Sequence, residues 1–257
     1  VDAEINKEID PKYIEVAESL KGKVTRKVIK QTVMTSVYGV TFIGARQQIQ
    51  RQLKDKKLYE TNGELYQASK YLAKITIKCI GDLFHDANKI KDWFSRCAKI
   101  VAHSNDSVKW VTPLGLPWVQ PYKRLSNKDI IATVLQNLTV INNLDDQPVN
   151  KNKQNTAFPP NFVHSIDSTH MMYTALKCRE YGITFAAVHD SYWWHPRHVE
   201  NMAKILRDQF VKLHSEPLLE NLRENFCERY PHNKFPEVPE RGTFNLEEVK
   251  DSAYFFA

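Results

Sequence analysis

The pattern of apolar and polar positions predicts helices over most of the first hundred residues. Apolar side chains recur every three or four residues over 64–85 and again over 86–102, as expected of helices that bury one face. Trp93 and Phe94 lie on the apolar face of the second helix and are assigned to the core. Two further helices are predicted over 10–21 and 45–54.

The middle of the chain changes to short strands. Four segments are predicted to form two hairpins, 108–112 with 118–122 and 130–135 with 138–141. The second hairpin would turn at Gln136-Asn137. The polar stretch that follows, over 142–156, predicts an exposed, mobile loop.

Helices return in the last hundred residues, with one more hairpin among them. Helices are predicted over 160–181, 199–214 and 217–229, and Asn245 with Glu248 would cap a last short helix. An apolar strand over 184–188 leads into His189-Asp190, and a second apolar strand follows. The predicted fold class is therefore α+β, mostly helical, with short antiparallel strands.

One further helix, predicted over 26–39, separates its residues into two faces of opposite character. At about 100° per residue, one face collects four β-branched residues: Val24, Val28, Ile29 and Val33. The other face collects three cations, a thioether and a phenol within an arc of about 120°: Arg26, Lys27, Lys30, Met34 and Tyr38. Because the cations lie in the first turns, where free backbone N–H groups favour an anion, this face suits a triphosphate followed by a flat base or sugar.

The charge is concentrated around this helix. The chain has a net charge of +6 and a pI of about 9.0, yet residues 21–57 alone carry ten Lys or Arg and one acid. Such a basic segment fits a polyanionic partner. The four cysteines form no Cys-x-x-Cys pair, which argues against a zinc site and favours a reducing compartment. No apolar run approaches membrane-spanning length, so no membrane association is expected.

The spacing Arg-x3-Lys-x3-Met-x3-Tyr-Gly over 26–39 resembles the nucleotide-binding fingers helix of single-subunit, phage-type RNA polymerases and their DNA-polymerase relatives. The resemblance implies that Arg26 and Lys30 grip the incoming triphosphate. It implies that Tyr38, followed by Gly39, stacks at the insertion site and senses the sugar, and that Met34 lines the pocket. Lys30 and Tyr38 would then belong to the catalytic machinery.

Three later segments resemble the same family, in the same order. Asn-Phe-Val-His-Ser over 161–165 resembles the segment whose His lies beside the growing end, a role that His164 would inherit. Ala-Val-His-Asp-Ser over 187–191 resembles the palm motif that binds the catalytic metals, which makes Asp190 a metal ligand and a catalytic residue. Ser191 is the residue typical of RNA polymerases at this place, and the aromatic end over 253–257 resembles the family's C-terminal foot.

The resemblance implies a polymerase right-hand fold, with the mitochondrial branch as the most similar. Residues 1–160 would form the fingers, including a possible promoter-reading loop over 127–149, and 161–257 the C-terminal part of the palm. Expected partners are a DNA template and promoter, the RNA product, nucleoside triphosphates and mitochondrial transcription initiation factors, in the mitochondrial matrix. Two Mg²⁺ ions are expected in the complete enzyme. Contacts with nucleic acid are expected from Lys27, Arg46, Gln47, Arg51 and His189, although the polar face of 45–54 is equally typical of a solvated helix.

One departure from the family is serious. Two-metal phosphoryl transfer needs at least two carboxylates, and nothing in residues 1–25 fits the family's second aspartate. The sequence therefore predicts a C-terminal piece of a polymerase that is inactive alone. The prediction also requires the cationic row begun by Arg26 to face Asp190 across about one nucleotide.

Three other functions remain open. A DNA polymerase would use the same chemistry, but Ser191 and the mitochondrial-type motifs argue against it. A non-catalytic nucleic-acid-binding module would need only the basic segment 21–57 and would bind with steep salt dependence. A His-Asp phosphohydrolase would need several ligands converging on helices, whereas His189-Asp190 ends a strand.

Overall fold

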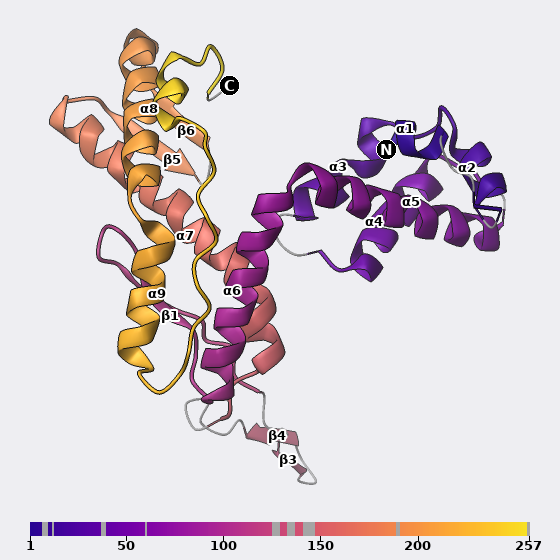
Figure 1. Ribbon diagram of the computed structural model, residues 1–257, viewed down its shortest axis with the longest axis horizontal. Coiled ribbons are helices and arrows are strands. Elements are labelled where there is room, and N and C mark those ends of the chain that lie inside the picture. Colours follow the sequence, from indigo (N-terminus) through magenta and orange to yellow (C-terminus); the bar gives the residue numbers. More distant parts are fainter. Residues whose placement is uncertain are drawn as a thin grey trace. The chain divides into compact units, whose positions relative to one another are not determined.

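The computed structural model describes residues 1–6, 10–11, 13–36, 40–59, 61–124, 129–132, 137–140, 147–188 and 191–255, with the backbone alone for 129–132 and 137–140. The chain divides into two compact units, Val1–Lys89 and Ile90–Ala257 (Figure 1). The functional division predicted at 160–161 stays a prediction, and this boundary lies inside a helix.

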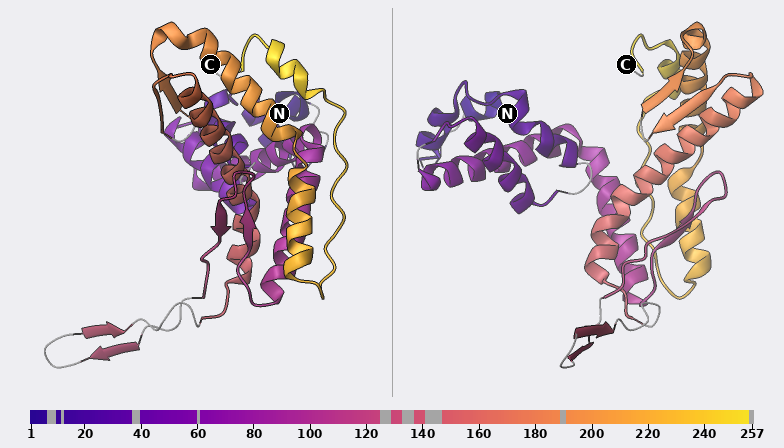
Figure 2. Two further views of the ribbon diagram at one scale, coloured as in Figure 1. Left: turned by 90° about the vertical axis from the view of Figure 1, so that its left-hand side faces the viewer. Right: turned by 180° about the vertical axis from the view of Figure 1, so that it is seen from behind.

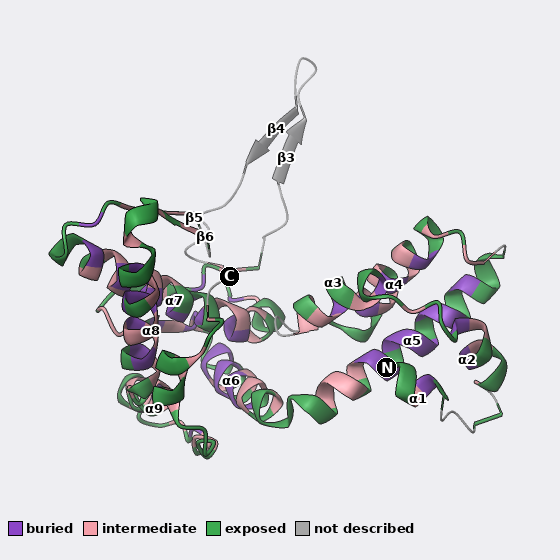
Figure 3. Ribbon diagram, turned by 90° about the horizontal axis from the view of Figure 1, so that it is seen from above, coloured by how far each residue is buried: buried purple, intermediate pink, exposed green. Residues whose placement is uncertain are grey.

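The first unit is helical throughout its described part. It contains α1 (Asp2–Asn6), α2 (Ile14–Leu20), α3 (Arg26–Ser36), α4 (Phe42–Asp55) and α5 (Asn62–Leu83). Thr41 and Thr61 cap α4 and α5, each accepting a hydrogen bond from a backbone N–H three residues later. The longest helix, α5, has buried residues on one side and exposed residues on the other (Figure 3), and it packs against α2, α3 and α4.

The second unit begins with α6 (His85–His103), although residues 85–89 count with the first unit. An aromatic core joins α6, the first hairpin, the long helix α7 (Lys151–Glu180) and α9 (Leu218–Arg229). Trp93 and Phe94 are 0% and 3% exposed, which confirms their assignment to the core. The indole of Trp93 donates to the Pro236 carbonyl at 3.1 Å, so its polar atom is satisfied inside this apolar cluster.

Three two-stranded antiparallel sheets are present among the described residues, which confirms the α+β class. They pair β1 (Lys109–Val111) with β2 (Pro117–Val119), β3 (Asp129–Ala132) with β4 (Asn137–Val140), and β5 (Phe185–Val188) with β6 (Ser191–Trp194). In the second sheet Ala132 pairs with Asn137. The prediction that Asn137 belongs to the turn is therefore wrong. Asn137 is a strand residue, whereas Gln136 lies outside the described residues.

The start of α7 corrects a second expectation. The polar stretch 142–156 was expected to be a loop and the helix to begin at 160, but α7 begins at Lys151 and contains Pro159 and Pro160. Residues 142–146 lie outside the described part of the chain. The Asn150 side chain caps the helix by accepting from the Lys153 N–H at 3.1 Å.

Gln154 explains why a polar sequence forms a buried helix here. Its side chain is fully buried, and its Oε1 accepts from the Val108 N–H at 3.1 Å and from the Gln120 Nε2 at 2.8 Å. Its Nε2 donates to the Gln120 carbonyl at 3.0 Å. These bonds join α7 to both sides of the first hairpin, because Val108 and Gln120 flank β1 and β2. Gln154 thus occupies an inward position of the helix where an apolar residue is usually found, and its hydrogen bonds make its burial possible.

The far end of α7 packs against α8 (Val199–Ser215) and the β5–β6 hairpin (Figure 2). A 3₁₀ turn, η2 (Pro196–His198), leads into α8, and a second, η3 (Leu246–Asp251), follows the predicted Asn245 cap. The Asn245 side chain accepts from the Glu247 N–H at 3.1 Å, so the expected pairing with Glu248 is not the contact that forms the cap. His170 of α7 is 5% exposed, and its Nε2 lies 3.0 Å from the Leu206 carbonyl of α8. Burial is the main reason that the pKa of His170 lies below its usual range, and His214 adds to this effect.

We expect Gln154→Ala to destabilise the second unit by about 2–4 kcal/mol, because the buried Val108 N–H loses its side-chain acceptor and the Nε2 and carbonyl of Gln120 each lose one hydrogen bond. All five tryptophans, at 93, 110, 118, 193 and 194, lie in this unit. Tryptophan fluorescence during urea unfolding of the chain therefore reports the second unit. Asn152→Ala, at an exposed position two residues earlier on α7, is the matched control and should leave the midpoint unchanged. An unchanged midpoint for Gln154→Ala would contradict the role of this network.

The second unit should lose stability as the pH falls below about 6.5, the ordinary pKa of histidine. Because the folded pKa of His170 is lowered, the unfolded chain binds more protons between the folded value and 6.5. The contribution of neutral His170 to the free energy of unfolding is thus complete above that pH window and is lost as the pH falls through it. Urea midpoints at pH 7.5 and 5.5 should differ more for the unsubstituted chain than for His170→Gln. Equal differences in the two chains would exclude His170 as a source of the pH dependence.

Candidate nucleotide-binding helix and metal hairpin

The two faces of α3 have the burial that the sequence predicts. Val28 and Thr32 are 1% and 0% exposed, whereas the side chains of the basic row face solvent. Arg26, Lys27 and Lys30 are all exposed, and Met34 is 57% exposed. Residues 37–39 are outside the described part, so the places of Tyr38 and Gly39 stay predictions. The described turns present a row of cations, then a thioether, along one side of an 11-residue helix.

Polar contacts fix α3 against its neighbour α4. The hydroxyls of Thr32 and Thr35 each lie 3.2 Å from the Oε1 of Gln48, which is half-buried between the helices. The Nζ of Lys56 donates to the Thr25 hydroxyl at 2.6 Å, just before α3 begins. Because the buried side is held by packing and hydrogen bonds, the cationic side keeps a fixed direction relative to α4.

On α4, the expected nucleic-acid contacts divide into two kinds. Gln47 and Arg51 are exposed, as contacts with a phosphate backbone require. Arg46 is half-buried, its Nη1 donates to the Gln50 Oε1 at 2.7 Å, and its guanidinium lies 4.7 Å from the ring centre of Tyr66. Arg46 therefore already has partners within the first unit, whereas Gln47 and Arg51 present their polar groups to solvent.

In the second unit, the Asn-Phe-Val-His-Ser segment lies within α7. Its His164 is exposed, while Phe162 and Ser165 are buried. The Ser165 hydroxyl accepts from the Trp110 indole at 2.9 Å and donates to the Phe162 carbonyl at 2.7 Å. The Nδ2 of Asn161 donates to the Gln120 Oε1 at 2.9 Å. These contacts set the rotation of α7 that turns His164 outward.

Sequence reasoning missed the structural roles of four polar residues, Gln48, Gln154, Asn161 and Ser165. Each is an amide or hydroxyl residue at a place where helical periodicity turns a side chain inward. A polar residue at an inward position of a predicted helix, matched by a second amide in a neighbouring element, is the signal that could have revealed them.

The predicted metal motif lies at the β5–β6 hairpin. Val188 pairs with Ser191, so the two-residue connection is His189-Asp190, which lies outside the described residues. Among the residues that are described, no group of three or more His, Cys, Asp or Glu could hold a metal ion. The role of Asp190 as a metal ligand stays a prediction. The expectation that Asp190 faces Arg26 across about one nucleotide also stays a prediction.

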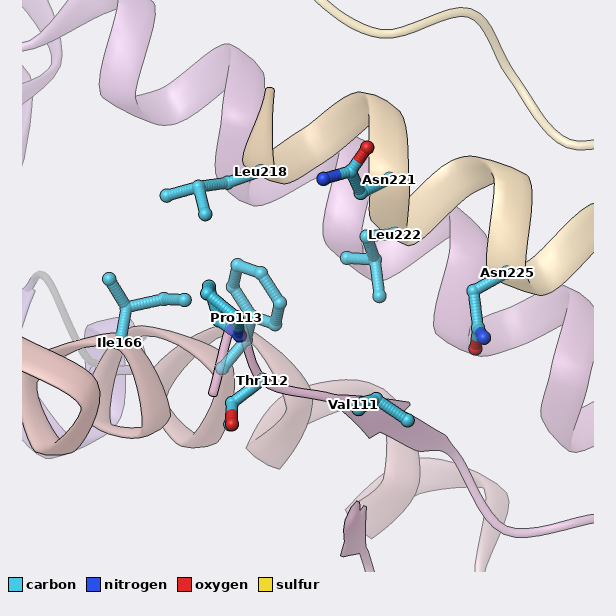
Figure 4. A pocket seen from close by; sticks show the side chains of 9 residues that line it. Val111, Thr112, Pro113, Ile166, Leu218, Asn221, Leu222 and Asn225 are labelled. Carbon is cyan, nitrogen blue, oxygen red and sulfur yellow. The ribbon is translucent and has the colours of Figure 1, made fainter. Parts of the chain in front are cut away.

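A pocket of about 230 Å³ lies between α9, the end of β1 and α7 (Figure 4). It is lined by Val111, Thr112, Pro113, Phe162, Ile166, Leu218, Asn221, Leu222 and Asn225. None of these nine residues carries a charge, so the pocket offers no counterion for a triphosphate. No helix in the described part of the chain is long and apolar enough to cross a membrane.

Comparison with known proteins gives a consistent result. The family profile described as DNA-dependent RNA polymerase matches residues 1–235. The chain is 52% identical over 240 residues to the mitochondrial DNA-directed RNA polymerase 1 of Nicotiana sylvestris, covering 93% of this chain and 24% of that protein. It is 48% identical over 255 residues to the chloroplastic/mitochondrial DNA-directed RNA polymerase 2 of Arabidopsis thaliana, covering 99% and 25%.

A third relative is shorter. DNA-directed RNA polymerase 2A of Nicotiana tabacum is 49% identical over 240 residues, which cover 93% of this chain and 71% of that protein. The chain thus spans about a quarter of the length of the two longer relatives. The matched region contains the α3 motif, the α7 segment and the β5–β6 motif. By this match the chain belongs to the DNA-dependent RNA polymerase family.

Proposed function

We propose that this chain is the part of a DNA-directed RNA polymerase that binds the incoming ribonucleoside triphosphate on α3 and contributes Asp190 to the metal site. The enzyme would copy a DNA template into RNA. The observation that carries the proposal is the exposed row Arg26, Lys30 and Met34 on a helix whose opposite face is buried. Membership of the RNA polymerase family supports it.

Arg26 and Lys30 would neutralise the triphosphate. They are one helical turn apart at the beginning of α3, so both cations and the positive end of the helix dipole can act on one polyanion. Negative charge accumulates on the pyrophosphate as it leaves, and cations fixed by a packed helix stabilise that charge without having to reorganise. Lys30 is therefore the residue on this helix best placed to act in the transition state.

Tyr38 and Gly39 would continue the same face beyond Met34. A phenol at this point can stack on a base or oppose the sugar, and His164 on α7 would help to favour a ribose. Met34 supports the proposal because its exposed thioether lies one turn before Tyr38 in the sequence.

The expected Mg²⁺ ions would activate the RNA 3′ hydroxyl and stabilise the leaving group. Asp190 supplies one hard oxygen ligand, which suits Mg²⁺. A two-metal site needs more carboxylates, and the described residues supply no cluster that could complete it. The residues present therefore fit one ligand of such a site and not the whole site.

Contacts with the template and product would come from Lys27, Gln47 and Arg51, with Arg46 and His189 as further candidates. The basic segment 21–57 that carries the first four gives them a common positive field. Within a right-hand polymerase fold, 1–160 would serve as fingers, 161–257 as part of the palm, and the β3–β4 hairpin as a promoter-reading loop. The existence of that hairpin supports the last assignment.

The proposed location is the mitochondrial matrix, with promoter DNA and mitochondrial initiation factors as partners. The names of similar proteins support an organelle enzyme, some mitochondrial, some chloroplastic and some both.

Asp190→Ala in the complete polymerase that contains this chain should lower RNA extension by on the order of a thousandfold, because a metal-binding carboxylate is lost. Binding to a primed template should persist. Extension of a labelled RNA primer and a gel-shift assay measure the two properties separately. Asp92→Ala, at an exposed carboxylate of α6, should behave as the unsubstituted enzyme. Extension retained by Asp190→Ala would refute the metal role.

Tyr38→Phe should admit deoxynucleotides more readily, because the hydroxyl that distinguishes ribose from deoxyribose is removed. The measurement is the ratio of kcat/KM for a ribonucleotide and for the matching deoxynucleotide, which should fall by about tenfold. Tyr181→Phe, 64% exposed at the end of α7, serves as the control. A ratio that does not change would remove Tyr38 from the sugar-sensing role.

A further inference from the structure

Arg207 of α8 ties the C-terminal segment 252–255 to its helix. The Nη2 of Arg207 donates to the Ser252 carbonyl at 2.8 Å, and its Nη1 donates to the Ala203 carbonyl of its own helix at 2.9 Å. The second bond holds the guanidinium against α8, and the first fixes the chain end to it. The preceding turn η3 also packs on α8 (Figure 1).

The same guanidinium holds an aromatic ring. The Phe255 ring centre lies 5.7 Å from the Arg207 Cζ, and Phe255 makes an edge contact with Phe210 at 5.0 Å. The neighbouring Tyr254 is 89% exposed, so Phe255 is the ring of this segment that turns inward. The Nε of Arg207 is buried and has no hydrogen-bond partner among the described residues. Leaving a buried donor unpaired costs free energy, so other contacts of Arg207 must offset that cost. The hydrogen bond to the Ser252 carbonyl and the contact with the Phe255 ring are the contacts that do so.

Phe255 packs on the cluster that supports the β5–β6 hairpin. This cluster consists of buried residues of α7, α8 and the segment between α7 and β5, and Phe185, Tyr192 and Trp194 of the hairpin pack against it together with Phe255. The other face of the hairpin is open, since Val188 and Trp193 are 58% and 52% exposed. An isolated two-stranded hairpin is at best marginally stable, so within the described residues the position of this one depends on the face that packs on the cluster.

We propose that Arg207 is a positioning residue for the metal-binding hairpin: it holds Phe255 against the cluster under β5 and β6 and thereby fixes the connection that carries Asp190. This inference rests on the proposed function for its catalytic consequence. Loss of the guanidinium releases Ser252 and Phe255, the cluster loses one aromatic ring, and the hairpin gains freedom. A metal ligand displaced by about 1 Å costs about a hundredfold in rate.

The test compares Arg207→Met with Lys204→Met in the complete polymerase. Methionine keeps an apolar stem at both positions, and Lys204 is an exposed cation on the same helix. The first readout is hydrogen–deuterium exchange of the peptide containing 185–194, which needs no catalytic activity. We expect exchange of its slow amides to become at least tenfold faster in Arg207→Met and to be unchanged in Lys204→Met, with α9 peptides unchanged in both.

The second readout is catalytic. In Arg207→Met, kcat for extension should fall ten- to a hundredfold and the Mg²⁺ concentration for half-maximal rate should rise, while KM for the nucleotide, which concerns α3, should not change. Phe255→Ala should reproduce both readouts with the guanidinium in place. Arg207→Lys, which keeps a cation and a donor, should restore part of the rate.

The outcomes separate the two proposals. Unchanged exchange in the hairpin peptide of both Arg207→Met and Phe255→Ala would overturn the positioning role, whatever the activity. Faster exchange with unchanged kcat and Mg²⁺ dependence would overturn its catalytic consequence. If the unsubstituted polymerase extended no RNA, the proposed function would fail, and the exchange measurement would still decide whether Arg207 holds the hairpin.

Discussion

The second unit depends on the burial of α7 along its whole length. Its N-terminal part, as far as Ile166, contributes Phe158, Phe162 and Ile166 to the aromatic core with α6 and α9. Its last turns contribute Cys178 to the cluster with α8 and the β5–β6 hairpin. One 30-residue helix, about 45 Å long, therefore fixes the distance between two separate apolar clusters. Since His164 lies between Phe162 and Ile166, its position follows from the packing of the aromatic core.

The two clusters hold their elements differently. The aromatic core surrounds Trp93, Trp110 and Phe158 on several sides and satisfies the polar atoms of its indoles with a carbonyl and a hydroxyl. The second cluster supports its hairpin from one face and draws on the chain end for part of its packing. Within the described part of the chain, the aromatic core is thus enclosed on several sides, whereas the hairpin with the proposed metal ligand packs through one face. Such a difference is common where a functional element must be both fixed and approachable.

How far the sequence predicts this structure varies with the kind of interaction. The faces of α3 could be predicted because Val28 and Thr32 recur at helical spacing and little else competes for them. The beginning of α7 could not, because its inward position is occupied by Gln154, whose partners Val108 and Gln120 are distant in sequence. The turn between β3 and β4 was misplaced because a polar pair, Gln136-Asn137, suits a turn locally, whereas the ladder takes Asn137 into the strand. The chemistry of Tyr38 and Asp190 was assigned from resemblance and remains to be tested.

The two prolines of α7 have a consequence for the order in which the chain acquires structure. Pro159 and Pro160 have no N–H, so the carbonyls of Asn155 and Thr156 lose their helical donors and the two turns around them gain little from local bonding. We therefore expect 151–158 to become helical only together with its tertiary partners. Two of those partners, α6 and the first hairpin, precede it in the chain and are synthesised before it, whereas a third, Phe226 of α9, follows it. The segment that gains least from local helical hydrogen bonds can thus begin to pack on α6 and the first hairpin during synthesis.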